Sequence, residues 1–467
     1  MIVVIEFIRA NLKQLFDRIS GNNFMSRRLT LILGITIYLF VAPALSAVPT
    51  LVKDINPVGN SAPDELTVMG DTLFFVINQG DFDLQLWRSD GSESGTQLVK
   101  LTNPGGLSFA SNLVAVGNTL FFKGRDTANG FELWKSDGTP SGTSMLKDIN
   151  PSGNSSPSEL VSVGGILYFT ATDGSNGREL WKSDGTEAGT VMVKNIDAQS
   201  SDSDVASLTE HNGLVFFQAD DGVSGRELWK SDGTSAGTQL VLDIEPGSSS
   251  SSPEQLTSSS LLLYFKAYTD ENSYELWKSN GSAGGTALVK DIREGDFSSN
   301  LDLLTAVGTS LYFIADDGIN GTELWRSNGT VSDTFLVRDI GPGIISSSPE
   351  YLSDVAGRLF FTARSTTEGY ELWKSDGTSG STLRVKDIVP GITSAGISEI
   401  KGVNGIAYFS ANDGVNGSEL WSSDGLSGGT SMVADISPSG GSNPRRFTQL
   451  GDTLLFSAND GSNGTEL

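Results

Sequence analysis

The sequence predicts an all-β protein, a β-propeller of eight to nine four-stranded blades with about 48 residues in each blade. The eight tryptophans of the 467-residue chain recur every 47 or 48 residues, and each interval contains four short segments rich in β-branched and aromatic residues. After Val48 no apolar pattern with the period of a helix persists for ten residues. An open β-solenoid is the alternative, but the coils of solenoids are usually shorter than this repeat.

Residues 1–47 differ from the rest of the chain. Arg27 and Arg28 precede the apolar run LTLILGITIYLFV, which ends in the small residues APALSA. This order of basic, apolar and small residues predicts a secretory signal peptide cleaved before Val48, so residues 1–47 are an N-terminal extension and signal. An uncleaved membrane anchor is the alternative, because the run from Leu29 to Ala47 could almost span a bilayer.

Residues 48–467 then form a single propeller domain. In the third repeat the four strands are expected at Thr143–Ile149, Glu159–Val163, Ile166–Ala171 and Arg178–Ser183, and the glycines between the second and third strands are typical of a tight hairpin. If the strand ending in Asp-Ile opens each unit, eight full units follow Thr50. A ninth unit is then truncated at Leu467, just before its tryptophan.

Composition excludes several classes of function. The chain has 31 Lys and Arg against 56 Asp and Glu, for a net charge of −25, which argues against binding to nucleic acids or anionic membranes. It has no cysteine and one histidine, so thiolate zinc sites and multi-histidine centres are excluded within one chain. His211 is expected to be a surface turn residue. The sequence shows no zinc motif, phosphate loop or serine-hydrolase elbow in a suitable context.

The stretch ELWKSDGT occurs at 179–186, 227–234 and 371–378. It resembles the signature of the bacterial ELWxxDGT repeat family, and the resemblance implies an exported, cell-surface or extracellular bacterial protein of poorly defined activity. Ala171, Asp173, Gly177 and Trp181 are also spaced as in the tryptophan-docking motif of pyrroloquinoline-quinone dehydrogenase propellers. That resemblance implies that each tryptophan packs against a neighbouring blade; the tryptophans are Trp87, Trp134, Trp181, Trp229, Trp277, Trp325, Trp373 and Trp421.

The loop before each tryptophan is acidic. An Asp lies eight residues before most of the tryptophans, and a Glu lies two residues before them. Carboxylates and free carbonyls are hard ligands suited to Ca²⁺, so we predict possible calcium sites at Asp126, Asp173, Glu179, Asp221, Glu227, Asp317, Glu323, Asp413, Glu419 and Asp460. The alternative is a hairpin in which the Asp accepts local backbone N–H groups and the Glu faces water. No other cofactor is required.

A second recurring acid ends the strand that opens each unit. If that strand is innermost, these acids would line the central channel and favour a cation; otherwise they form a solvated cap. The residues are Asp54, Asp148, Asp243, Asp291, Asp339, Asp387 and Asp435.

The near-equivalence of the repeats predicts a non-catalytic scaffold for binding or adhesion, because an active site needs one asymmetric group of residues. Equivalent loops suit multivalent contacts with an extracellular glycan or protein ligand. Neither nucleic acid nor a membrane span in the mature chain is expected. The alternatives are a secreted propeller enzyme that acts on polysaccharide through acids in one divergent blade, and a structural spacer stabilised by Ca²⁺.

Overall fold

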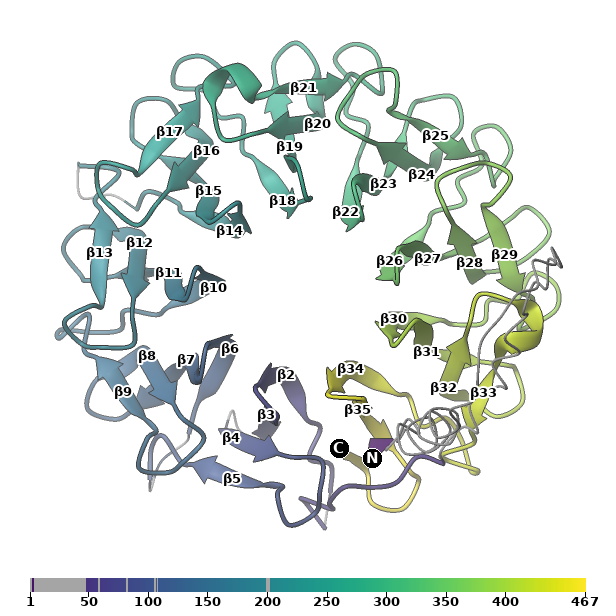
Figure 1. The fold of residues 1–467 in the computed structure, drawn as a ribbon, viewed down its shortest axis with the longest axis horizontal. Helices are drawn as coiled ribbons and strands as arrows, with labels where there is room; N and C mark the ends of the chain where they lie inside the picture. Colours follow the sequence, from purple (N-terminus) through teal and green to yellow (C-terminus); the bar gives the residue numbers. More distant parts are fainter. Residues whose placement is uncertain are drawn as a thin grey trace, which may run out of the picture.

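A computed structural model describes residues 2–3, 48–57, 59–80, 83–104, 106, 108–198 and 202–467. Nine four-stranded antiparallel sheets stand side by side around a central channel (Figure 1). The fold is therefore a nine-bladed β-propeller, which confirms the predicted all-β class. Two 3-10 turns, η1 (Ala283–Gly285) and η2 (Ser427–Gly429), are the helical elements of the described part of the chain. The predicted N-terminal extension and signal peptide, residues 1–47, lie outside the described residues apart from β1 (Ile2–Val3) of the extension.

We number the blades in chain order and give the strands of each from the channel outwards. Blades 1 to 3 comprise β2 (Asp64–Met69), β3 (Thr72–Asn78), β4 (Leu84–Ser89) and β5 (Gln97–Lys100); β6 (Ala110–Val116), β7 (Thr119–Asp126), β8 (Gly130–Ser136) and β9 (Ser144–Lys147); β10 (Ser158–Val163), β11 (Ile166–Thr172), β12 (Arg178–Ser183) and β13 (Val191–Lys194). Blades 4 to 6 comprise β14 (Ala206–His211), β15 (Leu214–Asp220), β16 (Arg226–Ser231) and β17 (Gln239–Leu242); β18 (Glu254–Ser258), β19 (Leu263–Thr269), β20 (Ser273–Ser279) and β21 (Ala287–Lys290); β22 (Asp302–Val307), β23 (Ser310–Asp316), β24 (Thr322–Ser327) and β25 (Phe335–Arg338). Blades 7 to 9 comprise β26 (Glu350–Val355), β27 (Arg358–Ala363), β28 (Glu371–Ser375) and β29 (Leu383–Lys386); β30 (Ser398–Val403), β31 (Ile406–Asn412), β32 (Ser418–Ser423) and β33 (Thr430–Ala434); β34 (Arg445–Leu450), β35 (Thr453–Asn459) and β36 (Thr465–Glu466).

The core lies between blades. One cluster joins Tyr168 and Leu180 of blade 3 to Phe217 and Trp229 of blade 4, and corresponding clusters fill other seams around the ring. The second strand of each blade is almost fully buried because its two faces meet two neighbours; in β11, Leu167 and Phe169 are 0% exposed. Burial of aromatic side chains at every seam supplies much of the stability of the ring.

Basic side chains also join neighbouring blades. Lys194 at the end of β13 donates to the carbonyl of Thr238 in blade 4, at 2.9 Å, and its ammonium lies 5.4 Å from the centroid of the Trp229 ring. A Lys or Arg at the same position makes the equivalent bond at six other seams, through Lys53, Lys100, Lys147, Lys290, Arg338 and Lys386. At the seam between blades 4 and 5 this position is Leu242, which packs beside Trp277.

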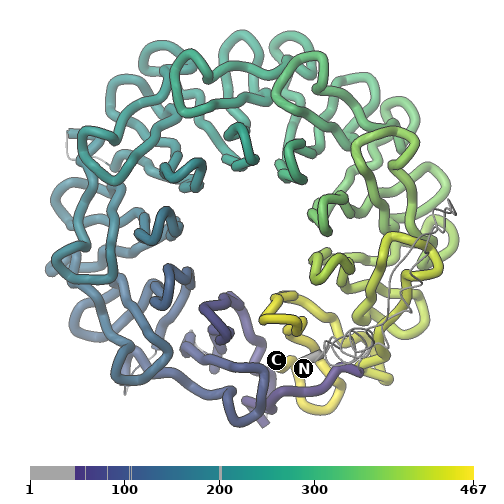
Figure 2. The backbone as a smooth tube through the Cα atoms, viewed as in Figure 1, coloured from purple at the N-terminus to yellow at the C-terminus, as the bar shows by residue number. Residues whose placement is uncertain are grey.

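The two ends of the described ring meet in blade 9 (Figure 2). The backbone N–H of Val52 donates to the carbonyl of Leu467, so residues 50–55 lie along β36 and take the place of the outer strand. Val52 and Leu467 are buried in one cluster with Leu73 and Phe75 of blade 1. β1 pairs with β35 in the same blade. The unit that the sequence presents as truncated is thus completed by the segment that follows the predicted signal.

The strand order corrects one expectation. The segment ending in Asp-Ile does not open a blade; β9, for example, is the outermost strand of blade 2. The innermost strand is the one expected second, such as β10 (Figure 1). The seven acids that follow the outer strands, Asp148 among them, therefore do not line the central channel.

Candidate functional site

The glutamate that lies two residues before every tryptophan except Trp87 is a buried anchor. Glu132 is 0% exposed, and its carboxylate accepts the backbone N–H groups of Ile149, at 2.9 Å, and Ser155, at 2.8 Å, together with the Ser155 hydroxyl at 2.6 Å. It thereby fixes the crossover from the outer strand of its own blade to the inner strand of the next. The alternative in which this glutamate faces water is wrong.

Burial changes the protonation of these anchors. Removal from water raises the pKa of Glu227 to about 6 and the pKa of Glu179, Glu275 and Glu371 to about 7, although the hydrogen bonds that each carboxylate accepts oppose the shift. The pKa of Glu132, Glu323 and Glu466 is raised for the same reason. These groups therefore release their protons nearer to neutral pH than an exposed glutamate does.

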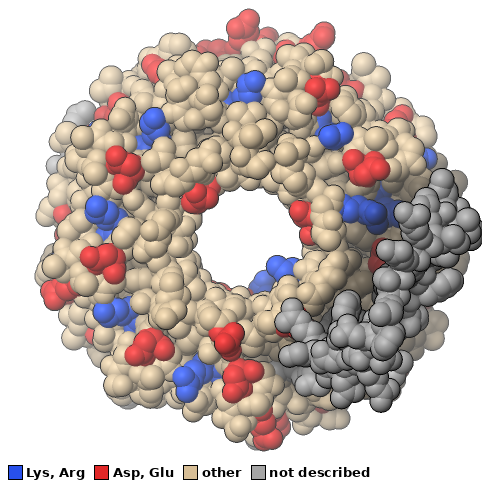
Figure 3. Space-filling view, viewed as in Figure 1, with Lys and Arg blue, Asp and Glu red and all other residues tan. Residues whose placement is uncertain are grey.

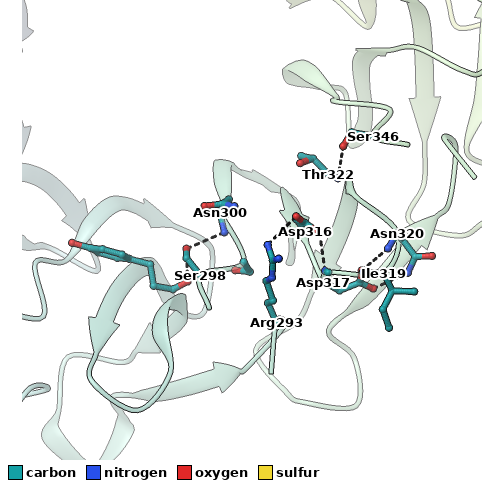
Figure 4. A network of polar contacts seen from close by, with 12 residues as sticks. Arg293, Ser298, Asn300, Asp316, Asp317, Ile319, Asn320, Thr322 and Ser346 are labelled. Carbon is teal, nitrogen blue, oxygen red and sulfur yellow. Dashed lines mark hydrogen bonds and ion pairs between the residues drawn. The ribbon is translucent and has the colours of Figure 1, made fainter. Parts of the chain in front are cut away.

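The aspartates of the same loops hold their own turns. In blade 6, Asp317 accepts the backbone N–H groups of Ile319 and Asn320 and the Asn320 side-chain amide at 2.7 Å (Figure 4). Asp126, Asp173, Asp221, Asp413 and Asp460 make the same backbone contacts. These hydrogen bonds lower the pKa of Asp173, Asp317, Asp413 and Asp460, against the opposing effect of burial.

The structure does not gather the predicted calcium ligands into clusters. Within the described ranges, no group of three or more His, Asp or Glu side chains is arranged to hold a metal ion. The Asp of each loop serves its own turn, whereas the Glu serves the following crossover. Calcium binding at these loops stays a prediction.

The channel wall at blades 8, 9, 1 and 2 combines a basic residue with acidic and amide residues at equivalent positions. Every inner strand contains a bulge whose residue has φ between 50° and 60°, which non-glycine residues rarely adopt. These residues are Glu65, Asn112, Glu159, Ser207, Gln255, Leu303, Tyr351, Glu399 and Arg446. The bulge places a different side chain at the same point of each blade.

Four successive bulge residues, Glu399, Arg446, Glu65 and Asn112, line one pocket of about 590 Å³. Leu66, Ile400 and Phe447 add apolar surface to its lining, and Asp64 and Lys401 add charge. Figure 3 shows Lys or Arg side chains on the lower wall of the channel, on the side where β34 lies. Carboxylates and cations from different blades thus converge around one hollow.

Polar contacts link these blades. Arg446 of blade 9 forms a two-pronged ion pair with Asp64 of blade 1, with Nε–Oδ1 at 2.8 Å and Nη2–Oδ2 at 3.0 Å. Glu399 accepts the backbone N–H of Arg446, and Glu65 accepts the backbone N–H of Leu113 at 3.1 Å. Desolvation raises the pKa of the Glu65 carboxyl above its ordinary value of 4.5, and the Leu113 N–H opposes this shift.

His211 is not a surface residue, contrary to expectation. It is 1% exposed at the end of β14, where Nδ1 lies 2.9 Å from the Ser258 hydroxyl of blade 5. Desolvation lowers its pKa. The ring therefore helps to join blades 4 and 5 in its neutral form.

Sequence reasoning missed the channel pocket because the inner strand was assigned wrongly. The one feature of the sequence that could have indicated this pocket is the basic residue Arg446. It is the only basic residue among the nine bulge positions, and the neighbouring blades 8 and 1 both place a glutamate there. That pattern can be recognised only once the repeats are aligned on the correct strand.

No family model matches the chain, and no curated protein matches it. Solved structures that match include a puromycin hydrolase at 14% identity and a TM-score of 0.39, covering 89% of this chain and 60% of that chain. A structure from a study of two prolyl endopeptidases shares 12% identity at a TM-score of 0.40, covering 77% and 54%. A puromycin-hydrolyzing peptidase of Mycobacterium tuberculosis shares 12% identity at a TM-score of 0.36, covering 75% and 57%. The chain thus spans 54–60% of the length of these proteins.

These neighbours are named as hydrolases and peptidases, whereas the sequence predicts a non-catalytic adhesion scaffold, and we withdraw that prediction. At this level of similarity the comparison transfers no residue role and no activity to the chain. Within the described ranges, no helix has the length and apolar character needed to cross a membrane. The function therefore has to be argued from the channel pocket.

Proposed function

We propose that the protein binds a small zwitterionic ligand, such as an amino acid or a short peptide, in the channel pocket of blades 8, 9, 1 and 2. One observation carries this proposal: cations and carboxylates from blades 8, 9 and 1 converge on a single site that blade 2 completes with Asn112 and Leu113, whereas the loop aspartates and the buried glutamates are used for turns and crossovers. A guanidinium is suited to a carboxylate because it can offer two parallel N–H groups.

The charges of the pocket match the two ends of such a ligand. Arg446 and Lys401 supply positive charge for a carboxylate, and Glu65 and Glu399 supply acceptors for an ammonium group. Leu66 and Ile400 offer apolar surface between them. A volume of about 590 Å³ suits a small molecule rather than a folded partner.

Calorimetric titration with the dipeptide Ala-Ala tests the proposal. We expect saturable binding at one site per chain, and loss of at least tenfold in affinity for Arg446→Gln. N-acetyl-Ala-Ala-amide, which has neither charge, and a neutral disaccharide should bind far more weakly. Equal binding of the neutral compounds, or binding of Ala-Ala that Arg446→Gln leaves unchanged, would disprove it.

The raised pKa of Glu65 favours a second candidate function, acid–base catalysis in the same pocket. A carboxyl with a raised pKa donates a proton nearer to neutral pH than an ordinary glutamate does, and Glu399 lines the same pocket as a second carboxyl. This is the secreted-enzyme alternative, located away from the divergent loops where it was expected. Product formation from Ala-Ala or from an oligosaccharide, abolished by Glu65→Gln, would support catalysis; binding without any product would reject it for these substrates.

Export and family membership are also proposals. The basic, apolar and small residues of positions 25–47 support secretion. The repeated ELWKSDGT stretches support membership of the ELWxxDGT repeat family. Mass spectrometry of the protein expressed with residues 1–47 in a bacterial host tests export: the expected product starts at or near Val48 outside the cytoplasm, and an uncut cytoplasmic product would refute it.

A further inference from the structure

The ion pair in the channel pocket already has the geometry that a bound carboxylate would take. Asp64 meets the guanidinium of Arg446 through both of its oxygens, at 2.8 and 3.0 Å. Bidentate contacts of this kind are the preferred way in which arginine recognises carboxylates. Asp64 therefore occupies the position that our proposed function assigns to the ligand.

The pair is also accessible. The side chains of Arg446 and Asp64 are 46% and 51% exposed, and both line the pocket. An exposed ion pair contributes only about 0 to 1 kcal/mol, so exchange of one carboxylate for another costs little. A fully buried pair would not be exchangeable in this way, because breaking it would leave an unpaired buried charge.

The rest of the pocket keeps Arg446 in place when Asp64 leaves. The backbone N–H of Arg446 is held by Glu399, and Phe447, the next residue, is 7% exposed in the core. The backbone N–H of Glu65 is held by the Asp64 carboxylate itself at 2.7 Å, so one Asp64 oxygen keeps a local partner after the ion pair opens.

We propose that Asp64 is a built-in competitor of the ligand: its carboxylate closes the Arg446 site in the free protein and is displaced when a ligand carboxylate binds. This inference rests on the proposed function. It assigns Asp64 a role in setting the affinity and the carboxylate selectivity of the pocket, not in contacting the ligand.

Blade 6 offers a matched control. Asp302 occupies the position of Asp64 on its own inner strand and likewise accepts the N–H of the next residue, Leu303, at 2.7 Å. The bulge residue of the preceding blade, which is the position that Arg446 holds beside Asp64, is Gln255, so Asp302 faces no arginine there. Replacement of either Asp by Asn removes the same charge from equivalent places in the fold.

The test is calorimetric titration of wild type, Asp64→Asn, Asp302→Asn and Arg446→Gln with Ala-Ala and with N-acetyl-alanine, which carries only the carboxylate. We expect Asp64→Asn to bind both compounds about threefold more tightly, the gain that loss of an exposed competing ion pair allows. Asp302→Asn should match the wild type, and Arg446→Gln should lose binding. Thermal melts check that each variant folds.

The outcomes separate the two proposals. Wild-type binding that Arg446→Gln abolishes and Asp64→Asn leaves unchanged or weakens would overturn the competitor role while the proposed function stands. The same gain in both Asn variants would also overturn it, because a general charge effect would then suffice. Binding by neither wild type nor Asp64→Asn would overturn both proposals together.

Discussion

Blade 3 and blade 9 have the same architecture, but they are held together differently. In blade 3 all four strands follow one another in the chain, and Glu179 fixes the next crossover by accepting the Ile196 N–H and the Ser203 hydroxyl. In blade 9 the equivalent glutamate, Glu466, accepts the N–H groups of Ile55 and Ser61 from the other end of the chain. The same contact that shapes a loop in one blade closes the ring in the other.

The comparison of blades 3 and 9 shows how asymmetry arises in a repeat protein. Each blade contacts mainly its two neighbours, so an identical seam can be repeated around the ring. The seam between blades 9 and 1 joins distant parts of the chain on its outer side through Val52 and Leu467. On its channel side it carries the Arg446–Asp64 pair. The proposed ligand site therefore coincides with the closure.

The largest expected effect is a loss of thermal stability when Glu466, rather than Glu179, is replaced by alanine. Glu466→Ala takes the acceptor from the Ile55 N–H, leaves the Ser61 N–H and hydroxyl with the Thr465 carbonyl alone, and frees a contact that spans about 405 residues of chain. Each unsatisfied buried group costs roughly 1–3 kcal/mol, and the freed segment also gains conformational entropy. We expect the melting temperature to fall further for Glu466→Ala than for Glu179→Ala. Equal falls would show that closure adds nothing beyond the local contact.

The next effect is the dependence of stability on pH. The pKa of Glu179 is about 7 in the folded protein and about 4.5 when the chain is unfolded, so the folded state binds the proton more tightly. This stabilisation is complete below pH 4.5 and is lost as the pH rises through 7, by about 1.4 kcal/mol for each unit of pKa difference.

The melting temperature of the wild type should therefore rise when the pH is lowered from 8 to 5. Glu179→Gln, which resembles the protonated anchor, should melt higher than wild type at pH 8 and show a shallower pH dependence. A melting temperature that is flat or falls over this range would contradict the burial-driven shift.

A smaller effect concerns the basic residues at the seams. Lys53 and Lys194 each donate to a threonine carbonyl of the next blade, at 2.8 and 2.9 Å, and Lys53 also holds the segment that completes blade 9. Replacement by Met should cost about 1–2 kcal/mol in either case, with the larger loss at Lys53. Urea titration of both variants, with Leu242→Lys as the reciprocal change, measures the free energy of unfolding. A larger loss for the Lys194 variant than for the Lys53 variant would contradict the special role of the closing segment.

The smallest effect is expected from calcium. Since the loop aspartates bond their own turns and the glutamates bond the crossovers, neither is free to form a rigid cluster. Millimolar CaCl₂ should raise the melting temperature by less than about 2 °C by mass action on weak sites. A rise of several degrees that EDTA reverses would show that the loops reorganise into calcium sites.

The sequence was sufficient to predict the blades but not their boundaries. Eight tryptophans at one spacing require identical seams, and this predicted the repeat length and the fold class. The chain itself does not indicate which strand faces the channel, because the segment around Lys147 and the strand after it are equally short and apolar. The order of the strands within a blade becomes clear only from the way the ring closes, where the segment around Val52 lies beside Leu467 as the outer strand of blade 9.

The buried glutamates were predictable from one overlooked regularity. Glu179 and Trp181 are two residues apart, so they point to the same face of their strand, and the tryptophan packs in a seam. The glutamate had to be buried with it. The channel pocket could not be predicted in this way, because it forms only when the bulges of the neighbouring blades 8, 9, 1 and 2 come together as the ring closes.

Hydrogen–deuterium exchange with and without saturating Ala-Ala tests most directly whether function is confined to the closure. We predict added protection at residues 64–69, 110–116, 398–403 and 445–450, and no change at the corresponding inner strands of blades 3 to 7. Protection repeated at all nine inner strands, or confined to the outer loops, would contradict this prediction.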